Sequence, residues 1–268
     1  MTGRDVARDR ATMPPGTDRV LDRRSLARDQ RRLAQRLVPG LAVLDVGCGT
    51  GAITRGIAEA VAPGGRVVGV DVSEALITAA RREHGAVPGL VFEVHDVYRL
   101  PFREEFDVVT AARVLQWLAR PADAIAAMAR AARPGGRVLV LDFNHDKLGL
   151  EPAPPAAARA FLAAFLRWRA EAGMDNAMAD HLADLFARAG LRDVGVSPQH
   201  EDVRRGEPDF EARAGIWADV AATRGHQMVA DGAIDEARRA AAEAELRAWA
   251  ASTATAHAMY LLAVEGIV

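Results

Sequence analysis

Residues 42–54, AVLDVGCGTGAIT, combine a short apolar run, an acidic residue and a glycine-rich turn. The run Ala42–Val46 is typical of a buried β-strand that is covered on both faces. Gly47, Gly49 and Gly51 allow backbone angles that other residues avoid, and they let a ligand approach the main chain. The apolar segment that follows indicates a helix whose first amides point toward that ligand. The stretch therefore predicts a site for a nucleotide-type cofactor.

Asp45 limits which cofactor this turn can take. The spacing Gly47-x-Gly49-x-x-Ala52 also fits the dinucleotide fingerprint, so the glycines alone leave an NAD(P)-dependent oxidoreductase open. A dinucleotide would bring a doubly negative pyrophosphate to the turn, and a carboxylate at the end of the preceding strand would repel it. S-adenosylmethionine instead carries an ammonium and a sulfonium group. Asp45 therefore favours S-adenosylmethionine, with a turn or helix-dipole role for this residue as the alternative.

Two further acidic residues follow predicted strands. The strand Arg66–Asp71 ends in an acid 20 residues beyond Gly51 (71 − 51), where a carboxylate can accept hydrogen bonds from both ribose hydroxyls. The next strand, Leu90–His95, is followed by Asp96 at its C-terminal end, where open α/β sheets bind ligands. A carboxylate at that edge can accept from an adenine amino group.

The segment up to Phe143 continues the alternation of predicted strands and helices. A fourth strand, Phe106–Ala111, is followed by a helix from Pro121 and a fifth strand, Arg137–Phe143. Pro-Gly-Gly loops at 63–65 and 134–136 both lead into strands. This punctuation predicts strand–helix–strand units and a parallel sheet.

Taken together, these motifs resemble the class I S-adenosylmethionine-dependent methyltransferases. The resemblance is to the small-molecule branch, which includes the ubiquinone and menaquinone methyltransferases. It covers about residues 40–143 and rests on five segments in register: Val43–Gly51, Asp71–Ser73, Asp96–Val97 before Leu100–Phe102, Phe106–Val109, and Arg133–Gly136.

The resemblance implies a fold, a cofactor and a set of binding residues. The fold is α/β and Rossmann-like, with a seven-stranded, mostly parallel sheet whose last strand is antiparallel. The cofactor is S-adenosyl-L-methionine, which is converted to S-adenosyl-L-homocysteine. Gly47, Cys48 and Gly49 would contact its methionine part through the backbone, and Asp71 would hold the ribose. The remaining predicted contacts are Val72 on the adenine face, Asp96 and Val97 on the adenine edge, the main chain of Arg113 at the ammonium group, and Gln116 in the same segment.

Composition and charge limit the classes of partner that we expect the chain to bind. A formal charge of −2 over 268 residues and a pI near 6.4 provide no overall attraction to nucleic acid, so we expect a small-molecule acceptor. Cys48 is the single cysteine, so no intramolecular disulfide or thiolate zinc cluster can form. The histidines lack zinc-ligand spacing, and we predict no metal. No run is long and uncharged enough to span a bilayer, which predicts a cytoplasmic protein without stable membrane association. A homodimer is left open.

The N-terminal region differs in character from the cofactor half. Residues 1–16 carry charges and a Pro-Pro pair, and we expect a disordered tail, followed by a single methyltransferase domain over 17–268. Thr17–Val38 holds seven arginines and three aspartates with leucines at helical spacing, which predicts one amphipathic helix. Packing of this helix on the sheet is favoured over a role as a lid or as a basic contact for an anionic partner.

Beyond Phe143 the resemblance fades, and we expect cap insertions at about 145–180 and 205–252 that select the acceptor. The stripe Phe161, Phe165 and Trp168 is predicted to serve core packing rather than a pocket wall. The elements expected here are helices over Ala156–Ala170, His181–Ala189 and Pro208–Ser252, and strands over Leu191–Ser197 and His257–Val264.

Methyl transfer from a sulfonium is a direct displacement, so alignment of the acceptor supplies much of the acceleration, roughly 7–11 kcal/mol in intramolecular reference reactions. A base is needed only if the acceptor must lose a proton. His145, which follows the fifth strand, is the first catalytic candidate, with Asp146 as its orienting partner; His181 with Asp175 is the second. The function predicted is methyl transfer to an O, N or C atom of a small hydrophobic or aromatic molecule. A non-catalytic S-adenosylmethionine-binding protein is the further alternative.

Overall fold

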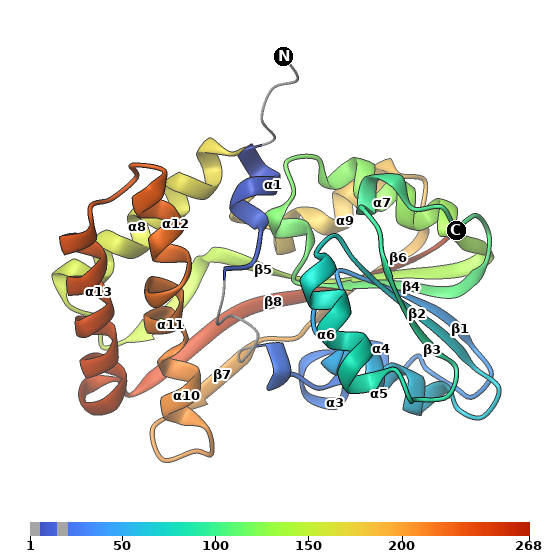
Figure 1. Ribbon diagram of the computed structural model, residues 1–268, viewed down its shortest axis with the longest axis horizontal. Helices are drawn as coiled ribbons and strands as arrows, with labels where there is room; N and C mark the ends of the chain where they lie inside the picture. The colour runs from blue at the N-terminus through green and yellow to red at the C-terminus, as the bar shows by residue number, and fades with distance from the viewer. Residues whose placement is uncertain (1–5, 15–20) are drawn as a thin grey trace.

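The computed structural model describes residues 6–14 and 21–268, which form a twisted sheet flanked by helices and extended by a helical cap (Figure 1). The strand order is β3-β2-β1-β4-β5-β8-β6, and β7 pairs with β8 off this path. The strands from β3 to β5 run parallel, whereas β8 is antiparallel to β5, β6 and β7. The predicted mostly parallel sheet with an antiparallel last strand is confirmed, and β7 is an addition to it. The strands are β1 (Ala42–Val46), β2 (Arg66–Asp71), β3 (Leu90–Val94), β4 (Phe106–Ala112), β5 (Ala132–Glu151), β6 (Arg192–Pro198), β7 (Glu201–Arg204) and β8 (Ala256–Ile267).

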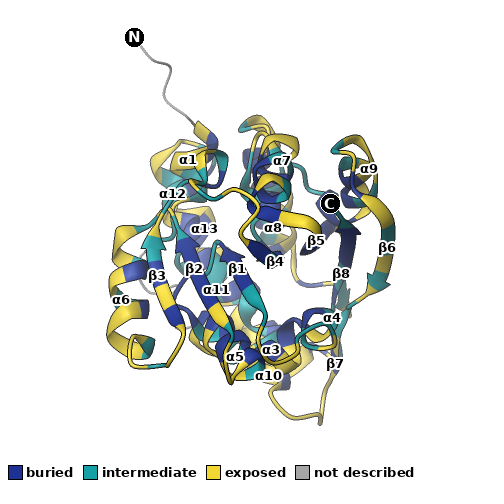
Figure 2. Cartoon of the chain, turned by 90° about the vertical axis from the view of Figure 1, so that its right-hand side faces the viewer, coloured by how far each residue is buried: buried dark blue, intermediate teal, exposed yellow. Residues whose placement is uncertain are grey.

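Helices cover both faces of the sheet, which explains why the central strands are almost continuously apolar. One face packs against α3 (Leu26–Asp29), α4 (Arg31–Ala34), α5 (Ala52–Val61) and α6 (Glu74–His84). The other face packs against α7 (Pro121–Ala131) and α9 (Met178–Arg188). Figure 2 shows β1 and β8 as largely buried, while the outer face of α6 is exposed. The ligand-binding edge of the sheet is thereby held between two packed layers.

The cap is carried on the extensions of β5 and β8. β5 runs for 20 residues, and its pairing with β8 shifts register between Asn144 and Gly149 before continuing to Glu151. Beyond this point lie α8 (Ala156–Glu171), α10 (Phe210–Ala214), α11 (Ile216–Ala222), α12 (Arg224–Ala230), α13 (Glu236–Ala248) and the π-helix η3 (Trp249–Thr253) (Figure 1). Phe161, Phe165 and Trp168 are buried in the core of this cap, as predicted. Phe165 also lines the cavity described below, so the prediction of core packing rather than a pocket wall is wrong for this residue.

The N-terminal region differs from both predictions made for it. The single helix expected over Thr17–Val38 is wrong for its described part, because the chain breaks at Gln30 (φ −142°, ψ 49°) between α3 and α4. Ser25 starts α3 as its N-cap and accepts a hydrogen bond from the amide of Arg28. Residues 17–20 lie outside the described residues.

The tail expected at residues 1–16 contains a helix. α1 (Val6–Ala11) is anchored by Arg10, which donates to the carbonyl of Trp168 and pairs with Asp231 of the cap at 3.1 Å. Ala7 is buried. The described residues 6–14 are therefore held by tertiary contacts that no local sequence pattern predicts. Residues 1–5 and 15–16 lie outside the described part. Within the part of the chain that is described, no helix has the length and apolar composition required to cross a membrane.

Candidate cofactor site and acceptor cavity

The glycine turn after β1 needs glycine for its backbone and for its space. Gly47, Gly49 and Gly51 have φ of 71°, 58° and 83°, in the left-handed region that favours glycine. A Cβ on Gly47 would lie 2.4 Å from Cγ2 of Val114, which is closer than atoms can approach. The turn is held by the amides of Gly47 and Cys48, which both donate to the carbonyl of Val70, at 2.7 and 3.0 Å. The turn is thus packed against the side chains of Val114, Leu21 and Phe92, and it has no space for side chains at its three glycines.

Cys48 is half-buried, and its thiol is not activated. Burial and the nearby carboxylates of Asp45 and Asp71 raise the pKa of Cys48 well above its ordinary value. The thiol is therefore protonated at neutral pH, which agrees with a small turn residue rather than a nucleophile.

Asp45 lies deeper than its predicted role requires. Its side chain is buried against α5, where Oδ2 accepts a hydrogen bond from Thr54 Oγ1 at 2.7 Å. Burial raises the pKa of Asp45 to about 7; the bond from Thr54 opposes this shift, and the charge of Asp71 adds to it. The negative charge of Asp45, and with it the repulsion of a pyrophosphate, is therefore weaker than the sequence predicts. Direct contact of Asp45 with a cofactor remains a prediction, and its observed contact supports the start of α5.

Asp71 and Asp96 follow neighbouring strands at one edge of the sheet. β2 and β3 are paired with Asp71 opposite Val94, and the amide of His95 donates to the carbonyl of Asp71 at 3.0 Å. The carboxylate of Asp71 accepts from the amide of Gly49 at 3.0 Å and from that of Ser73 at 2.9 Å. The structure therefore brings the glycine turn and the predicted ribose ligand into direct contact.

The neighbours of these acids suit an adenosine group. Val72 is 47% exposed, an uncommon state for a large apolar side chain, and it lies next to Asp71 in the chain. Asp96 caps the short helix η1 (Val97–Arg99) through Tyr98 N at 2.9 Å, and its other oxygen lies 3.8 Å from Arg8 Nη1. Val97 is buried.

Arg113 holds an unusual backbone position at the end of β4. Its φ is 60°, and its carbonyl accepts from Nε2 of Gln116 at 3.3 Å. Its guanidinium is also structured, because it pairs with Glu201 of β7, lies 3.8 Å from Asp29 and stacks over Phe143. The sequence assigns importance only to the main chain of Arg113, so this buried ion pair is a contact that it did not predict.

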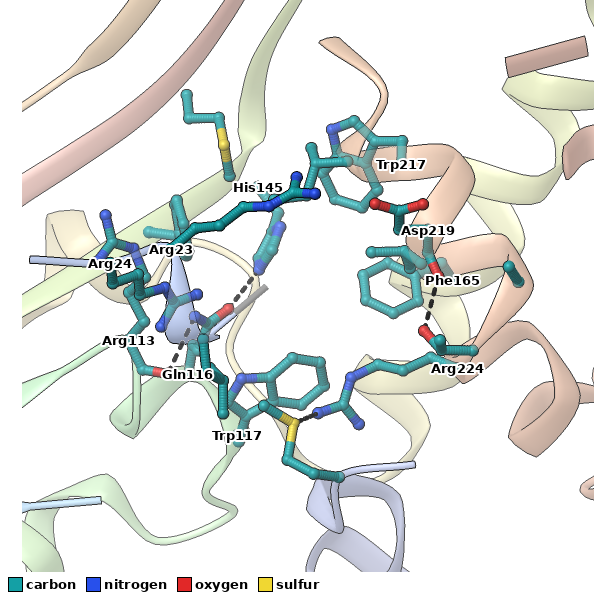
Figure 3. Close-up of a pocket in the computed structure, with 18 residues that line it drawn as sticks. Arg23, Arg24, Arg113, Gln116, Trp117, His145, Phe165, Trp217, Asp219 and Arg224 are labelled. Atoms are coloured by element: carbon teal, nitrogen blue, oxygen red, sulfur yellow. Dashed lines mark hydrogen bonds between the residues drawn. The ribbon is translucent and has the colours of Figure 1, made fainter. Parts of the chain in front are cut away.

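A cavity of about 290 Å³ opens between the sheet edge and the cap (Figure 3). A second cavity of about 570 Å³ shares part of its wall, including Arg23, Arg24 and Arg113. The smaller one is lined by Met13, Leu21, Arg23, Arg24, Arg113, Gln116, Trp117, Phe143, His145, Phe165, Ile216, Trp217, Asp219, Val220, Ala222, Thr223, Arg224 and Met259. Leu21 connects it to the glycine turn, since its Cδ1 lies 3.1 Å from where a Cβ on Gly49 would be.

His145 lines this cavity and is held by Gln116. Its Nε2 lies 2.5 Å from Oε1 of Gln116, whose Nε2 donates to Arg113 O, so the amide orientation assigns the proton to Nε2 of His145. Burial and the charge of Arg169 lower the pKa of His145 well below 6.5, so the ring is neutral at pH 7. The orienting partner is Gln116 and not Asp146, whose amide donates to Asn144 Oδ1 instead.

His181 lies elsewhere. It is exposed on α9, which packs on β5 and β8 of the sheet, and its Nδ1 pairs with Asp175 at 2.6 Å. That carboxylate raises the pKa of His181. His181 does not belong to the wall of either described cavity. Its catalytic role stays a prediction to which the geometry adds nothing.

The sequence did not predict several cavity residues: Arg23, Arg24, Trp217, Asp219 and Arg224. They come from the N-terminal region and from α11 and α12, so no local motif unites them. Their signal in the sequence is composition alone, namely arginines in segments expected to be solvated and a tryptophan in a helical cap.

Comparison with known proteins agrees with this geometry. Residues 44–140 match the family described as "Methyltransferase domain". Residues 44–140 are therefore similar to a methyltransferase domain. The matched residues span β1 to β5 and include both the glycine turn and the acids that follow β2 and β3.

The relatives share this domain rather than the whole chain. The chain is 36% identical over 127 residues to the ubiquinone/menaquinone biosynthesis C-methyltransferase UbiE of Ectopseudomonas mendocina (strain ymp), covering 46% of the chain and 47% of the relative. It is 37% identical over 124 residues to an uncharacterized 37.1 kDa protein in transposon TN4556 of Streptomyces fradiae, covering 46% and 36%. The match therefore spans half or less of these relatives.

The fold extends further than the sequence likeness. A putative methyltransferase from Bacillus halodurans C-125 superposes with a TM-score of 0.56 at 18% identity, covering 89% of this chain and 98% of that one. The Rossmann-like methyltransferase fold is therefore shared, and the cap is the part for which the sequence relatives provide no guide.

Proposed function

We propose that the chain transfers a methyl group from S-adenosylmethionine to an O, N or C atom of a small molecule bound in the cavity beneath the cap. The observation that carries this proposal is the meeting of the glycine turn with Asp71 at the end of β2, beside the exposed Val72 and near Asp96. The methyltransferase domain match and the UbiE relatives, which are named as C-methyltransferases, support it.

The donor set fits the cofactor group by group. Asp71 accepts hydrogen bonds from ribose hydroxyls, Val72 offers an apolar face for the adenine ring, and Asp96 with Val97 takes its edge. Gly47, Cys48 and Gly49 would contact the methionine part through their backbones. The carbonyl of Arg113, to which Gln116 donates, would accept from the ammonium group. Asp45 supports the turn through Thr54. When bound, the cofactor supplies an electrophilic methyl group.

His145 orients the acceptor in this proposal. With its proton on Nε2, the ring offers Nδ1 as a hydrogen-bond acceptor to an O–H or N–H group in the cavity. Burial and Arg169 disfavour the protonated ring, so His145 is better suited to align and polarise the acceptor than to carry a full proton. Trp117, Phe165 and Trp217 form walls that exclude water and suit a hydrophobic or aromatic acceptor. His181 is left as a second, untested candidate.

The two alternatives make different predictions. A nicotinamide-dependent oxidoreductase would bind NADH and not S-adenosylhomocysteine, and the comparisons do not favour it. A non-catalytic binding protein would bind S-adenosylhomocysteine without turnover. The proposal needs only a small-molecule partner; a homodimer and a cytoplasmic location stay predictions from the sequence.

Calorimetric titration of S-adenosylhomocysteine tests the cofactor site. Asp71→Ala removes charge-assisted hydrogen bonds and is expected to weaken binding by at least about tenfold. The matched control is Asp123→Ala, which removes an exposed aspartate from α7 and should bind as the parent does. Unchanged affinity in Asp71→Ala would show the ribose assignment to be wrong.

Turnover is measured as S-adenosylhomocysteine release over a panel of phenols, quinols, amines and carboxylic acids. Release with any member supports the enzyme. Silence across the panel, with S-adenosylhomocysteine still bound, favours the non-catalytic protein. Tight NADH binding in its place would overturn the proposal.

A further inference from the structure

Three arginines gather on one side of the acceptor cavity. Arg23, Arg24 and Arg113 line both the smaller and the larger cavity, and so they mark where the two meet. Figure 3 shows Arg24 and Arg113 together on the side of the cavity away from Phe165, while Arg23 extends from that side toward Trp217. This grouping is not explained by the cofactor site, whose predicted contacts lie on the glycine turn and the strand ends.

Two of these guanidinium groups have N–H donors without a hydrogen-bond partner in the described residues. Arg113 is buried, and although its Nη2 pairs with Glu201, its Nη1 is buried with no hydrogen-bond partner. Within the described residues, the side chain of Arg24 makes no hydrogen bond or ion pair of its own. Buried polar groups are nearly always satisfied, so the unpartnered Nη1 of Arg113 points to a ligand that accepts from it, and the half-exposed Arg24 in the same wall has donors available to that ligand.

Charge in the wall is unbalanced. Four arginines, the three above and Arg224, line the smaller cavity against a single carboxylate, that of Asp219. Loss of water around Arg24, followed by the charge of Arg113, lowers the pKa of Arg24 to about 9 even though Asp29 and Glu201 lie nearby. Arg24 is thus still a cation at neutral pH, and its positive charge is incompletely compensated.

Arg224 belongs to a different arrangement. Its guanidinium stacks over Trp117 at 3.8 Å and donates to the carbonyls of Arg10, Ala11 and Thr12 near the end of α1. It therefore holds the N-terminal segment against the cap, and its donors are in use. The available cations are those on the opposite side.

The rest of the wall is aromatic. Phe165 and Trp217 pack edge to face with ring centroids 5.8 Å apart, and each also contacts the ring of His145, at 6.1 and 6.0 Å. His145 therefore lies beside the apolar part of the cavity wall. Gln116 links it by hydrogen bonds to Arg113 in the charged part. A volume of about 290 Å³ is at the lower limit for small-molecule sites and suits a compact ligand.

We propose that the methyl acceptor is a small aromatic carboxylic acid, whose carboxylate is held by Arg24 and Nη1 of Arg113 and whose ring lies against Phe165 and Trp217. Arginine forks match a carboxylate in two parallel hydrogen bonds, which makes the acid group a binding and orienting handle. This inference rests on the proposed function, because it names the substrate class for the same cavity. It replaces a purely hydrophobic acceptor with one that is apolar at one end and anionic at the other.

The test compares acids with their amides. The protein, saturated with S-adenosylhomocysteine, is titrated by calorimetry with 4-hydroxybenzoate, 3,4-dihydroxybenzoate and 4-hydroxycinnamate, and with the corresponding primary amides. We expect at least one acid to bind roughly tenfold to a hundredfold more tightly than its amide, as for hydrogen bonds to charged groups. Equal affinity for every pair, or no binding by any acid, would overturn the inference.

Variants assign the effect to the arginines. Arg24→Gln should remove most of the preference for the acid, whereas Arg24→Lys, which keeps the charge but loses the fork, should keep part of it. Arg55→Gln removes an exposed arginine from α5 and is the control that should retain the full preference. If Arg24→Gln does not fold, Arg24→Lys carries the test, and a partial loss of the preference is expected. A preference unchanged in the folded variant would refute the assignment.

The two proposals fail separately. The acid and amide titrations are therefore repeated without S-adenosylhomocysteine. Absence of S-adenosylhomocysteine binding overturns the proposed function, and with it the acid's role as a methyl acceptor, even where the acid preference persists as binding. Normal S-adenosylhomocysteine binding without any acid preference counts against the acceptor class alone.

Discussion

Glu265 of β8 is a buried carboxylate that links the N-terminal region to the sheet through ion pairs. Its side chain is 5% exposed and accepts from Nη2 of Arg32 and Nη2 of Arg36, both at 2.5 Å. Arg137 of β5 lies 3.0 Å from its second oxygen. Three cations thus share one buried anion, and we predict that Glu265→Gln, which keeps the shape but removes the charge, destabilises the fold.

The shift in the pKa of Glu265 gives the size of the expected loss of stability. Burial alone would raise the pKa of Glu265, but the bonds from Arg36 and Arg32 and the charge of Arg137 outweigh it and hold the pKa at about 2, below the ordinary 4.5. A fall of that size corresponds to roughly 3 kcal/mol in favour of the folded state with the carboxylate ionised. Because the folded pKa is depressed, this stabilisation is fully present above pH 4.5 and is lost as the pH falls toward 2.

Urea unfolding followed by circular dichroism measures this directly. At pH 7, Glu265→Gln is expected to lower the free energy of unfolding by about 2–3 kcal/mol, and by less than half as much at pH 3, where the parent has already lost most of the benefit. Glu59→Gln, in an exposed pair with Arg55, is the control and should cost less than about 0.5 kcal/mol. A loss below about 1 kcal/mol at pH 7, or the same loss at both pH values, would refute the reasoning.

Two further predictions concern the site. Because the pKa of Asp45 is raised from 3.8 to about 7, the folded state favours its protonated form, and this stabilisation is lost as the pH rises from about 4 to 7. Asp45→Asn should therefore be no less stable than the parent at pH 8 in urea unfolding, and a loss above about 1 kcal/mol would contradict this. His145→Ala should lower methyl transfer by roughly tenfold to a hundredfold, measured as S-adenosylhomocysteine release with the best acceptor of the panel, whereas the exposed His181→Ala should change it by less than about twofold. Equal effects of both would contradict the placement of His145 in the cavity.

The cofactor half of the fold could be predicted from the sequence because its signals are local. The strands Ala42–Val46 and Arg66–Asp71 have the predicted bounds, since each is an apolar run closed by a turn or by an acid. β5 was expected to end at Phe143 but continues to Glu151, because its outer part is stabilised by pairing with β8. β7 (Glu201–Arg204) was not predicted, since three of its four residues are charged and the segment becomes a strand only beside β8.

The same distinction separates the two parts of the site. Gly49 and Asp71 lie 22 residues apart but belong to motifs that can be recognised one by one, and the fold joins them through a hydrogen bond of 3.0 Å. The acceptor cavity has no such motif. Arg24, His145 and Trp217 reach it from three distant segments, and only the packing of the cap on β5 and β8 determines that they meet. The substrate class therefore has to be argued from the assembled wall.

Gln116 connects these two parts, and all of its polar groups are in use. Its amide donates to Asp142 at 3.1 Å, and its carbonyl accepts from Arg169 at 2.9 Å. Its side chain donates to Arg113 O and accepts from His145. With the backbone of Gln116 fixed at both ends, its side-chain amide cannot turn over without breaking the bonds at Arg113 and His145 together. The orientation of His145 in the acceptor cavity is therefore tied to the carbonyl that the resemblance assigns to the cofactor ammonium. The sequence placed Gln116 among the cofactor residues; its contacts place it between the carbonyl of Arg113 and the ring of His145 in the cavity wall.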